Sequence, residues 1–382
     1  AGASQRARTP GPGRHRTVMF ERRLYNHIDW ALLGSVLALC TLGVAMIFST
    51  TSDPTRSNSH LYVTQLYGIG LGLIAMLFTM TLDYRTLTDR SHFVYIALIL
   101  VLLYVLFFGK VQMGARRWIP IGSFNLQPSE FAKIGVALVL AKFFGESRGA
   151  PTWLDLTITG ALTCLPLAII AKEPDLGTAV TLLPVFLGIA YVAGLRVRLL
   201  GYLALSLVLI APVAWKFALK DYQKTRISTF LDPSQDAKGA GYQQIQARIT
   251  VGSGGFLGKG FRQGTQGQLR FLPVAHNDFI FSVLAEEQGL AGVLVTLGLY
   301  LIVILRSLDA ARLAKDRFGS FLVLGVMAGF TFQVVYNVTM SAGLAPVKGL
   351  TLPLMSYGGS SMIATLAAFG LVLNVRMRRF TN

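Results

Sequence analysis

Charged residues are scarce in this chain of 382 residues. Asp, Glu, Lys and Arg together make up 14% of it, whereas 53% of its residues are hydrophobic. In water-soluble domains charged residues usually account for about 25%. The shortage of charge argues against a soluble enzyme and makes a membrane protein the first class to test.

Cysteine is also rare, because only Cys40 and Cys164 are present and both lie within apolar runs. They form neither a disulfide framework nor a zinc-ligand spacing, and we interpret them as packing residues. A phosphate-binding Walker motif is missing too, since Ser253 stands where its first Gly belongs and Gly260 follows Lys259 where Ser or Thr is needed. No internal repeat of 20 to 50 residues is visible.

Long apolar runs fill most of the sequence. A helix that crosses a bilayer needs about 20 apolar residues, and we count ten candidate spans. They are Trp30–Ser49, Tyr62–Leu82, Phe93–Gly109, Phe131–Phe144, Leu154–Ala171, Leu176–Gly194, Leu199–Ala218, Phe279–Leu305, Phe318–Met340 and Leu350–Leu373. The fourth run is short and carries Lys133 and Lys142. We therefore expect an all-α integral membrane protein with about ten transmembrane helices.

The basic residues predict the orientation of these helices. Residues 1–18 lack the apolar core of a signal peptide, and we interpret them as a disordered arm or a cloning remnant. Four arginines of this arm contribute to the net charge of +17, so we infer no nucleic-acid partner. Elsewhere, Lys and Arg concentrate in alternate short loops, and such residues are retained on the cytoplasmic side. Both termini are then cytoplasmic.

One long polar segment stands out in this topology. The outward loops are residues 50–61, 110–130, 172–175, 219–278 and 341–349, and residues 219–278, between the seventh and eighth helices, form by far the longest. We expect residues 19–382 to form a single polytopic membrane domain with this large extracellular loop. Its chemistry should lie on the outer face.

Two parts of the long loop have a recognisable pattern. Residues 241–251 place Tyr242, Ile245 and Ile249 on one side at helical spacing, which predicts an amphipathic helix at the membrane surface. Residues 252–267 follow with seven glycines, Lys259 and Arg262. Such a segment can direct several backbone N–H groups at one anion, although glycine content alone favours a flexible turn.

Several outward-facing motifs recur in a fixed order along the chain. They are RWIPIG with QPSEFAK (117–133), KEPDLGTA (172–179), GSGGFLGKGF (252–261), GTQGQLRFLPVAHNDFIFSVLAEEQG (264–289) and PLMSYGGSSM (353–362). From about Asp29 onward the chain resembles the SEDS membrane glycosyltransferases of the RodA and FtsW type. The short N-terminal region favours the RodA branch, which elongates the side wall and so sets cell shape.

The resemblance implies a peptidoglycan glycosyltransferase in the bacterial plasma (inner) membrane. Members of this family polymerise lipid II, a polyprenyl-pyrophosphate-linked disaccharide-peptide, together with a class B penicillin-binding protein that acts as transpeptidase. Attack by a sugar hydroxyl on an anomeric carbon requires a base and a stabiliser of the departing pyrophosphate. The reaction is either metal-independent or assisted by a divalent cation such as Mg²⁺ or Mn²⁺.

Asp278 is the candidate general base. It ends the long outward loop just before the eighth span, and it matches the Asp that the resemblance marks as essential. The alternative is that Asp278 caps the eighth helix, where the helix dipole favours an acid. Glu286 lies roughly 12 Å further along the helix, beyond the spacing of paired glycosidase carboxylates. We interpret Glu286 and Glu287 as structural or conformational residues, partnered with a buried cation or amide.

Further candidates surround this base. Glu130 and Lys133 are spaced i, i+3 on one helix face; a structural ion pair is the alternative to the cavity lining that the resemblance implies. Cations lie on the outer side despite the opposite bias of short loops, which suggests an anionic ligand, with lipid headgroups as the alternative. They are Arg116, Arg117, Lys172, Lys259 and Arg262. Trp118 is an interfacial anchor or stacks on a sugar.

The last span contains the polar sequence SYGGSS (356–361), which interrupts an otherwise apolar helix. Irregular backbone at that depth is tolerated where it lines a wet cavity, so Ser360 is a further candidate for substrate binding. Two other functions stay open: a lipid II flippase, which needs no base at the outer surface, and a scaffold for the transpeptidase, which would tolerate the loss of Asp278.

Overall fold

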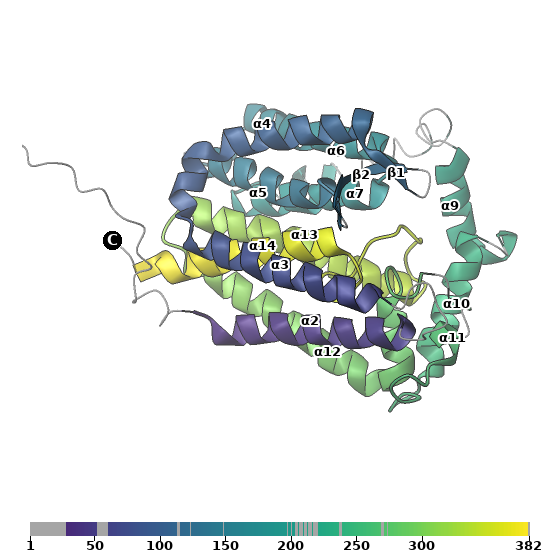
Figure 1. Cartoon of the computed structure of the whole chain (residues 1–382). Coiled ribbons are helices and arrows are strands. Elements are labelled where there is room, and N and C mark those ends of the chain that lie inside the picture. The colour runs from purple at the N-terminus through teal and green to yellow at the C-terminus, as the bar shows by residue number, and fades with distance from the viewer. Residues whose placement is uncertain are drawn as a thin grey trace, which may run out of the picture.

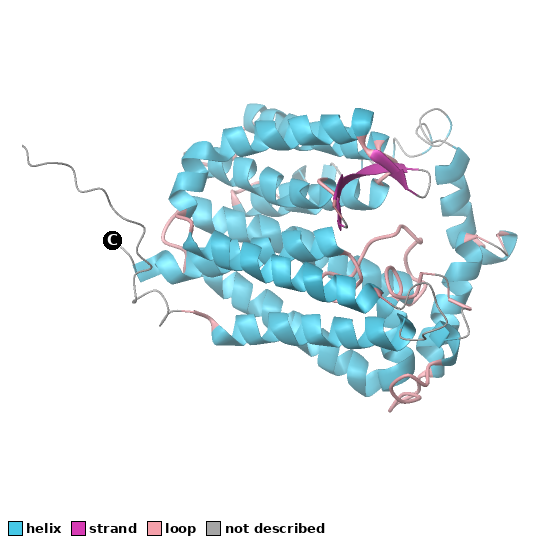
Figure 2. Cartoon of the chain, viewed as in Figure 1, coloured by secondary structure: helices cyan, strands magenta, loops and turns pink. Residues whose placement is uncertain are grey.

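The computed structural model is a bundle of long, roughly parallel helices with its irregular segments gathered at one end (Figure 1). It describes residues 28–51, 60–112, 115–122, 124–147, 149–196, 198–199, 221–236, 239–268, 271–272 and 274–380, with isolated positions between 201 and 216. Nearly all of the described elements are helices, and the strands form one small patch (Figure 2). The expected all-α membrane architecture is confirmed.

Nine of the ten expected spans appear as helices in the described part of the chain. They are α2 (Trp30–Thr51), α3 (Leu61–Thr81), α4 (Tyr84–Phe108), α5 (Ser129–Glu146), α6 (Trp153–Lys172), α7 (Leu176–Val192), α12 (Ile280–Arg312), α13 (Arg317–Ser341) and α14 (Gly359–Met377). Seven of them are long and apolar enough to cross a membrane; α5 and the shorter α7 are not among these seven. Most of the seventh expected span, residues 199–218, lies outside the described residues, so the count of ten stays a prediction.

Local sequence signals account for several helix starts. Thr152 and Asp155 form a reciprocal capping box at the start of α6, and Asp316 accepts a hydrogen bond from the Gly319 N–H at the start of α13. These side chains satisfy backbone donors that the first turn of a helix leaves without partners. The helix ends are thus encoded locally, while the apolar runs between them supply the length.

The last helix differs from its prediction. We expected one span from Leu350 to Leu373, but α14 begins only at Gly359, and residues 350–358 form an irregular, largely buried segment before it. The sequence SYGGSS therefore lies at the start of this helix and does not interrupt it. Polar side chains from neighbouring helices bind the irregular backbone. The apolar side chains of residues 350–355 are buried against protein, which explains their hydrophobicity without a membrane-spanning helix.

The centre of the bundle is formed by α13 and α14, most of whose residues are buried, whereas most residues in the apolar stretches of α3, α4, α6 and α12 are at least partly accessible. Exposed apolar side chains such as Phe78, Phe107 and Leu294 are consistent with contact to lipid. Asn374, fully buried on α14, donates hydrogen bonds to the carbonyls of Thr79, Met80 and Leu82 and so closes the end of α3.

The end of the bundle opposite the C-terminus carries the predicted outward segments (Figure 1). The first is a three-stranded antiparallel sheet of β1 (Lys110–Gln112), β2 (Ala115–Ile121) and β3 (Phe124–Leu126), in the order β1-β2-β3. The long loop contains α9 (Asp221–Leu231), η1 (Pro233–Gln235), α10 (Ala240–Ser253) and the short α11 (Thr265–Gln268). η2 (Arg378–Phe380) ends the described chain.

Helix α10 confirms the helix expected over residues 241–251. Its buried face consists of Gln244, Ala247 and Thr250, while Ile245 and Ile249 are exposed. Gln244 donates a hydrogen bond of 3.3 Å to the carbonyl of Gly343, which follows α13. The helix therefore packs on the bundle through small and polar residues, and its location at the membrane surface stays a prediction.

Candidate functional site

Asp278 lies in the turn that leads into α12. The helix begins at Ile280 with Phe279 at the N-cap position, so Asp278 lies one residue before the position that a capping side chain would occupy. Its side chain is half-buried, and Oδ2 lies 3.4 Å from the point where a Cβ on Gly349 would stand. The carboxylate therefore faces the segment between α13 and α14.

Asn337 joins the two segments that meet at Asp278. Its side-chain amide donates hydrogen bonds to the carbonyl of Asp278 at 2.9 Å and to the carbonyl of Leu350 at 2.6 Å. Asn337 is fully buried on α13. One amide thus fixes the main chain of the candidate base relative to the irregular segment that precedes α14.

Other buried polar groups hold this irregular segment. Gln65 of α3 donates to the carbonyl of Ser356 at 3.1 Å and accepts from the Gly358 N–H at 3.1 Å. The Tyr357 N–H donates to the carbonyl of His276, and the two rings meet edge to face with centroids 5.7 Å apart. Burial lowers the pKa of His276, so its imidazole is favoured in the neutral form beside Asp278.

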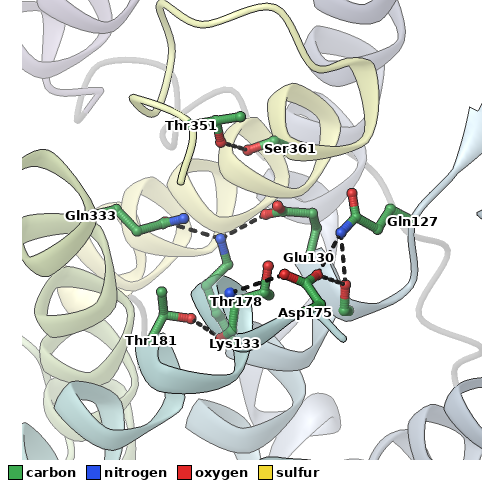
Figure 3. A network of polar contacts seen from close by, with 10 residues as sticks. Gln127, Glu130, Lys133, Asp175, Thr178, Thr181, Gln333, Thr351 and Ser361 are labelled. Atoms are coloured by element: carbon green, nitrogen blue, oxygen red, sulfur yellow. Dashed lines mark hydrogen bonds and ion pairs between the residues drawn. The ribbon is translucent and has the colours of Figure 1, made fainter. Parts of the chain in front are cut away.

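Glu130 and Lys133 form an ion pair inside the bundle (Figure 3). Lys133 Nζ donates to Glu130 Oε2 at 2.8 Å and to Gln333 Oε1 at 3.0 Å. The two charged residues are only 5% and 8% exposed, yet both line a cavity of about 30 Å³ together with Gln333 and Thr365. The structure thus shows the ion pair beside a small cavity, while the lining of a substrate cavity by these two residues stays a prediction.

Helix α13 connects this cavity with Asp278. Gln333, which holds Lys133, and Asn337, which holds the Asp278 main chain, are four residues apart on the same helix. Residues at that spacing lie on one helix face, roughly 6 Å apart along the axis. The two amides therefore lie next to each other on α13, and one reaches the buried ion pair while the other reaches the main chain of the candidate base.

The turn between α6 and α7 forms a second polar junction. Asp175 caps α7 by accepting from the Thr178 N–H at 3.3 Å, and its Oδ2 accepts from Gln127 at 2.8 Å and Ser129 at 3.3 Å (Figure 3). Arg117 donates to the carbonyls of Glu173 and Pro174 and lies 3.9 Å from Asp175. The predicted anion ligand Arg117 is thus bound to this turn.

Glu173 in the same turn is 1% exposed, and neither of its carboxylate oxygens has a hydrogen-bond partner among the described residues. Desolvation by burial raises the pKa of Glu173 from 4.5 to about 8. The nearby Asp175 carboxylate adds to this rise, and its effect is larger than the opposing effect of Arg117. The protonated form of this carboxyl group is therefore favoured at neutral pH.

The remaining predicted site residues lie at several places on the same end. Lys259 Nζ binds Glu286 Oε1 at 2.6 Å, and the Arg262 guanidinium lies 5.6 Å from the centre of the Phe48 ring. Arg116 donates to the Phe107 carbonyl at 2.9 Å. Lys172 is exposed. These cations do not converge on one point, and their roles as substrate ligands stay predictions.

Trp118 and Ser360 belong to the sheet region. Trp118 is half-buried on β2, paired with Lys110 of β1. Ser360 in the first turn of α14 accepts from the Gln127 N–H at 2.9 Å and donates to the Asn125 carbonyl at 3.0 Å. Ser360 thus braces the end of β3, and its predicted contact with substrate stays a prediction.

Sequence reasoning missed Gln333 and Asn337. A signal was available, because polar side chains four residues apart inside an apolar span usually face the protein interior and mark functional or structural sites. As for metals, the described part of the chain contains no group of three or more His, Cys, Asp or Glu side chains that could hold an ion.

Comparisons with known proteins agree with this architecture. Residues 30–380 match the FTSW_RODA_SPOVE family model, described as cell cycle protein. The peptidoglycan glycosyltransferase MrdB of Escherichia coli K12 is 37% identical, covering 92% of this chain and 94% of its own. The peptidoglycan glycosyltransferase RodA of Treponema pallidum is 33% identical, covering 92% and 98%.

Two solved structures resemble the fold. One, described as showing structural coordination of polymerization and crosslinking by a peptidoglycan synthase complex, has a TM-score of 0.81 and 35% identity over 93% of this chain and 99% of that one. The other is the rod shape determining protein RodA of Thermus thermophilus, with a TM-score of 0.69 and 33% identity over 93% and 98%.

Proposed function

Since the chain belongs to the FtsW, RodA and SpoVE family, we propose that it is a peptidoglycan glycosyltransferase that polymerises lipid II during cell-wall elongation. Relatives that bear this activity in their names align over nearly their whole length. The chain is a multi-span membrane protein, as its apolar helices require. The observation that carries the proposal is the half-buried Asp278 carboxylate, presented where the outward segments meet.

Asp278 acts as the general base. Its carboxylate accepts the proton of the 4-hydroxyl of lipid II while that oxygen forms a bond with the anomeric carbon of the growing glycan. The bond from the anomeric carbon to the lipid pyrophosphate breaks, and the pyrophosphate leaves with the electron pair. Attack from the side opposite the leaving group inverts the anomeric centre.

The surrounding cations and polar groups contact the substrate. Arg116, Lys172 and Arg262 lie at the same end of the bundle as Asp278 and suit the lipid pyrophosphate. The buried pair of Glu130 and Lys133 places charge in a cavity, where low polarity strengthens its interactions. Trp118 and Ser360 complete the proposed set on the sheet side.

We further propose that the protein works with a class B penicillin-binding protein. The solved structure with a TM-score of 0.81 belongs to a peptidoglycan synthase complex whose description names both polymerization and crosslinking. A transpeptidase partner would crosslink the strands that this chain produces.

The topology proposed for the chain is the one expected from its sequence. The active site faces outward, both termini are cytoplasmic, and residues 19–382 form one membrane domain with residues 219–278 as its extracellular loop.

The test is polymerisation of lipid II by the purified chain with its transpeptidase in detergent, with the products separated by size. D278N keeps the shape of the side chain but cannot accept the proton. D83N is the matched control, because Asp83 caps α4 at the opposite end of the bundle and Asn also serves as a cap. The proposal is supported if wild type and D83N produce polymer and D278N does not.

Two other outcomes would contradict it. Equal polymer from D278N would remove Asp278 from the role of base. Absence of polymer from all samples, together with passage of lipid II across vesicle membranes, would favour the flippase.

A further inference from the structure

Helix α12 is interrupted near its outer end. Gly289 has φ 63° and ψ −164°, which lies outside the helical region, so residues 280–288 form a first segment and residues 290–312 a second. Such a break frees backbone carbonyls before it and N–H groups after it. In a buried position these groups need new partners.

The Gly-rich segment, residues 252–267, supplies those partners. The N–H groups of Lys259 and Gly260 donate to the carbonyls of Glu286 and Glu287, each at 3.0 Å. In return, the N–H groups of Leu290 and Ala291 donate to the carbonyls of Gly255 and Phe256 at 3.0 and 3.1 Å. The Gly-rich segment therefore joins the two parts of α12 and fixes the angle between them.

Close packing at the break leaves no room for a side chain. A Cβ on Gly289 would lie 2.3 Å from the backbone nitrogen of Gly258. The glycines that suggested an anion site in the sequence thus allow backbone to lie against backbone, and the N–H groups of residues 259 and 260 are directed to helix carbonyls.

Glu286 anchors this arrangement. Its side chain is fully buried, and Oε1 is surrounded by donors from the Gly-rich segment. They are Lys259 Nζ at 2.6 Å, the Thr265 N–H at 2.9 Å, Thr265 Oγ1 at 3.0 Å, the Gln266 N–H at 3.2 Å and Ser253 Oγ at 3.5 Å. On the neighbouring side, Glu287 accepts a hydrogen bond from Ser49 of α2. The interpretation of both carboxylates as structural agrees with these contacts.

We propose that Glu286 is a positioning residue for the glycosyl transfer, because it fixes the first segment of α12 and thereby Asp278. Asp278 lies two residues before this segment, so any tilt or slide of residues 280–288 moves its carboxylate relative to Gly349. A glycine-rich chain is intrinsically flexible, and the bonds to a buried carboxylate provide the restraint. This inference rests on the proposed function, since it takes Asp278 as the base.

The variant E286Q tests the proposal with little change of shape. It keeps an acceptor oxygen but loses the charge, and hydrogen bonds to a charged acceptor are about twice as strong as those to a neutral one. We expect kcat for lipid II polymerisation to fall roughly 10- to 100-fold, because small misplacements of catalytic groups reduce rates by that order. KM should stay nearly unchanged. The acidic limb of the pH profile of kcat should shift, because the surroundings of the Asp278 carboxylate change when it moves.

A second variant and a control complete the experiment. T265V removes one donor, Thr265 Oγ1, and should change kcat and the pH profile in the same direction but less. E146Q replaces an exposed glutamate at the end of α5 and should leave both unchanged. Thermal unfolding of each variant in detergent gives the folded fraction by which the rates are normalised.

The outcomes separate this inference from the proposed function. Wild-type kcat in E286Q would overturn the positioning role, and so would a loss of rate that disappears when the rates are normalised by the folded fraction. Full activity of D278N would instead overturn the assignment of the base. If D278N loses activity while E286Q keeps the wild-type rate, the proposed function is retained and only the positioning role of Glu286 is rejected.

Discussion

Asn337 holds the main chain of Asp278 through a hydrogen bond of 2.9 Å, and the same amide group binds the Leu350 carbonyl at 2.6 Å. The candidate base thus depends on a residue that is about 60 positions away in the sequence and fully buried in α13. Because Gly349, next to Leu350, also lies against the Asp278 carboxylate, one side chain sets both the base and the surface that faces it.

Replacement of Asn337 by Ala should therefore affect catalysis as well as stability. Two buried carbonyls lose their donor, which costs about 1–3 kcal/mol each at most, and the Asp278 main chain loses its restraint. We expect kcat to fall roughly 10- to 100-fold. The measurement is the polymerisation rate, normalised by the folded fraction from thermal unfolding.

N374A is the matched control for this prediction. Asn374 is also a fully buried Asn that donates to main-chain carbonyls, among them Thr79 at 3.0 Å and Met80 at 2.8 Å, but it lies at the opposite end of the bundle. It should lose comparable stability while keeping its normalised rate. Equal losses of rate in N337A and N374A would show that Asn337 has no specific connection to the base.

The buried pair of Glu130 and Lys133 should separate stability from function. K133M leaves the Glu130 carboxylate buried without its cation, and removal of one partner of a buried ion pair costs about 3–5 kcal/mol. The double variant E130L/K133M removes both charges and should recover most of that free energy of unfolding. If the cavity contacts substrate, polymerisation remains lost in the double variant. A stable and fully active double variant would show that the pair only supports the fold.

Glu173 should make stability depend on pH. Its pKa is raised to about 8 in the folded chain from an ordinary value of 4.5, so the folded state holds a proton that the unfolded chain has released between these values. The free energy of unfolding therefore falls as pH rises from about 4.5 to about 8 and then becomes constant. E173Q lacks this proton, so its melting temperature should decline less over that range. Parallel curves for E173Q and wild type would contradict the shift.

Hydropathy predicted the helices but not the irregular backbone between them. The apolar runs located nine helices, although the last begins at Gly359 and not at Leu350, because bilayer-spanning segments need length and low polarity, which a sequence shows directly. Residues 350–355 misled the same criterion, since they are equally apolar but are buried against protein. Only distant side chains such as Gln65, Tyr300 and Asn337 show how this segment is held.

The candidate site was predictable where chemistry is local and not where it depends on packing. Asp278 could be selected from its motif and its place before a span. The partners of Glu286 could not be identified, because Lys259 and Thr265 come from a glycine-rich segment whose path no periodicity encodes. The same limitation concealed Asn337, whose importance follows from the two carbonyls that it reaches.

Gly349 provides a test of how tightly the base is enclosed. Its φ is 53°, and a Cβ there would lie 3.4 Å from Asp278 Oδ2. G349A should therefore lower the free energy of unfolding by about 1–2 kcal/mol, because alanine disfavours the left-handed conformation. It should also place a methyl group against the carboxylate. A methyl group displaces water and disfavours the charged form, so the acidic limb of the pH profile of kcat should move to higher pH.

G122A is the control for backbone strain alone. Gly122 has φ 59°, and nothing lies within 4 Å of the position of its Cβ. Both variants should lose similar stability, but only G349A should change the pH profile, because only its methyl group meets the base. A shift of equal size in G122A would attribute the effect to strain at this end of the bundle, and an unshifted G349A would mean that Asp278 does not titrate in the rate-limiting step.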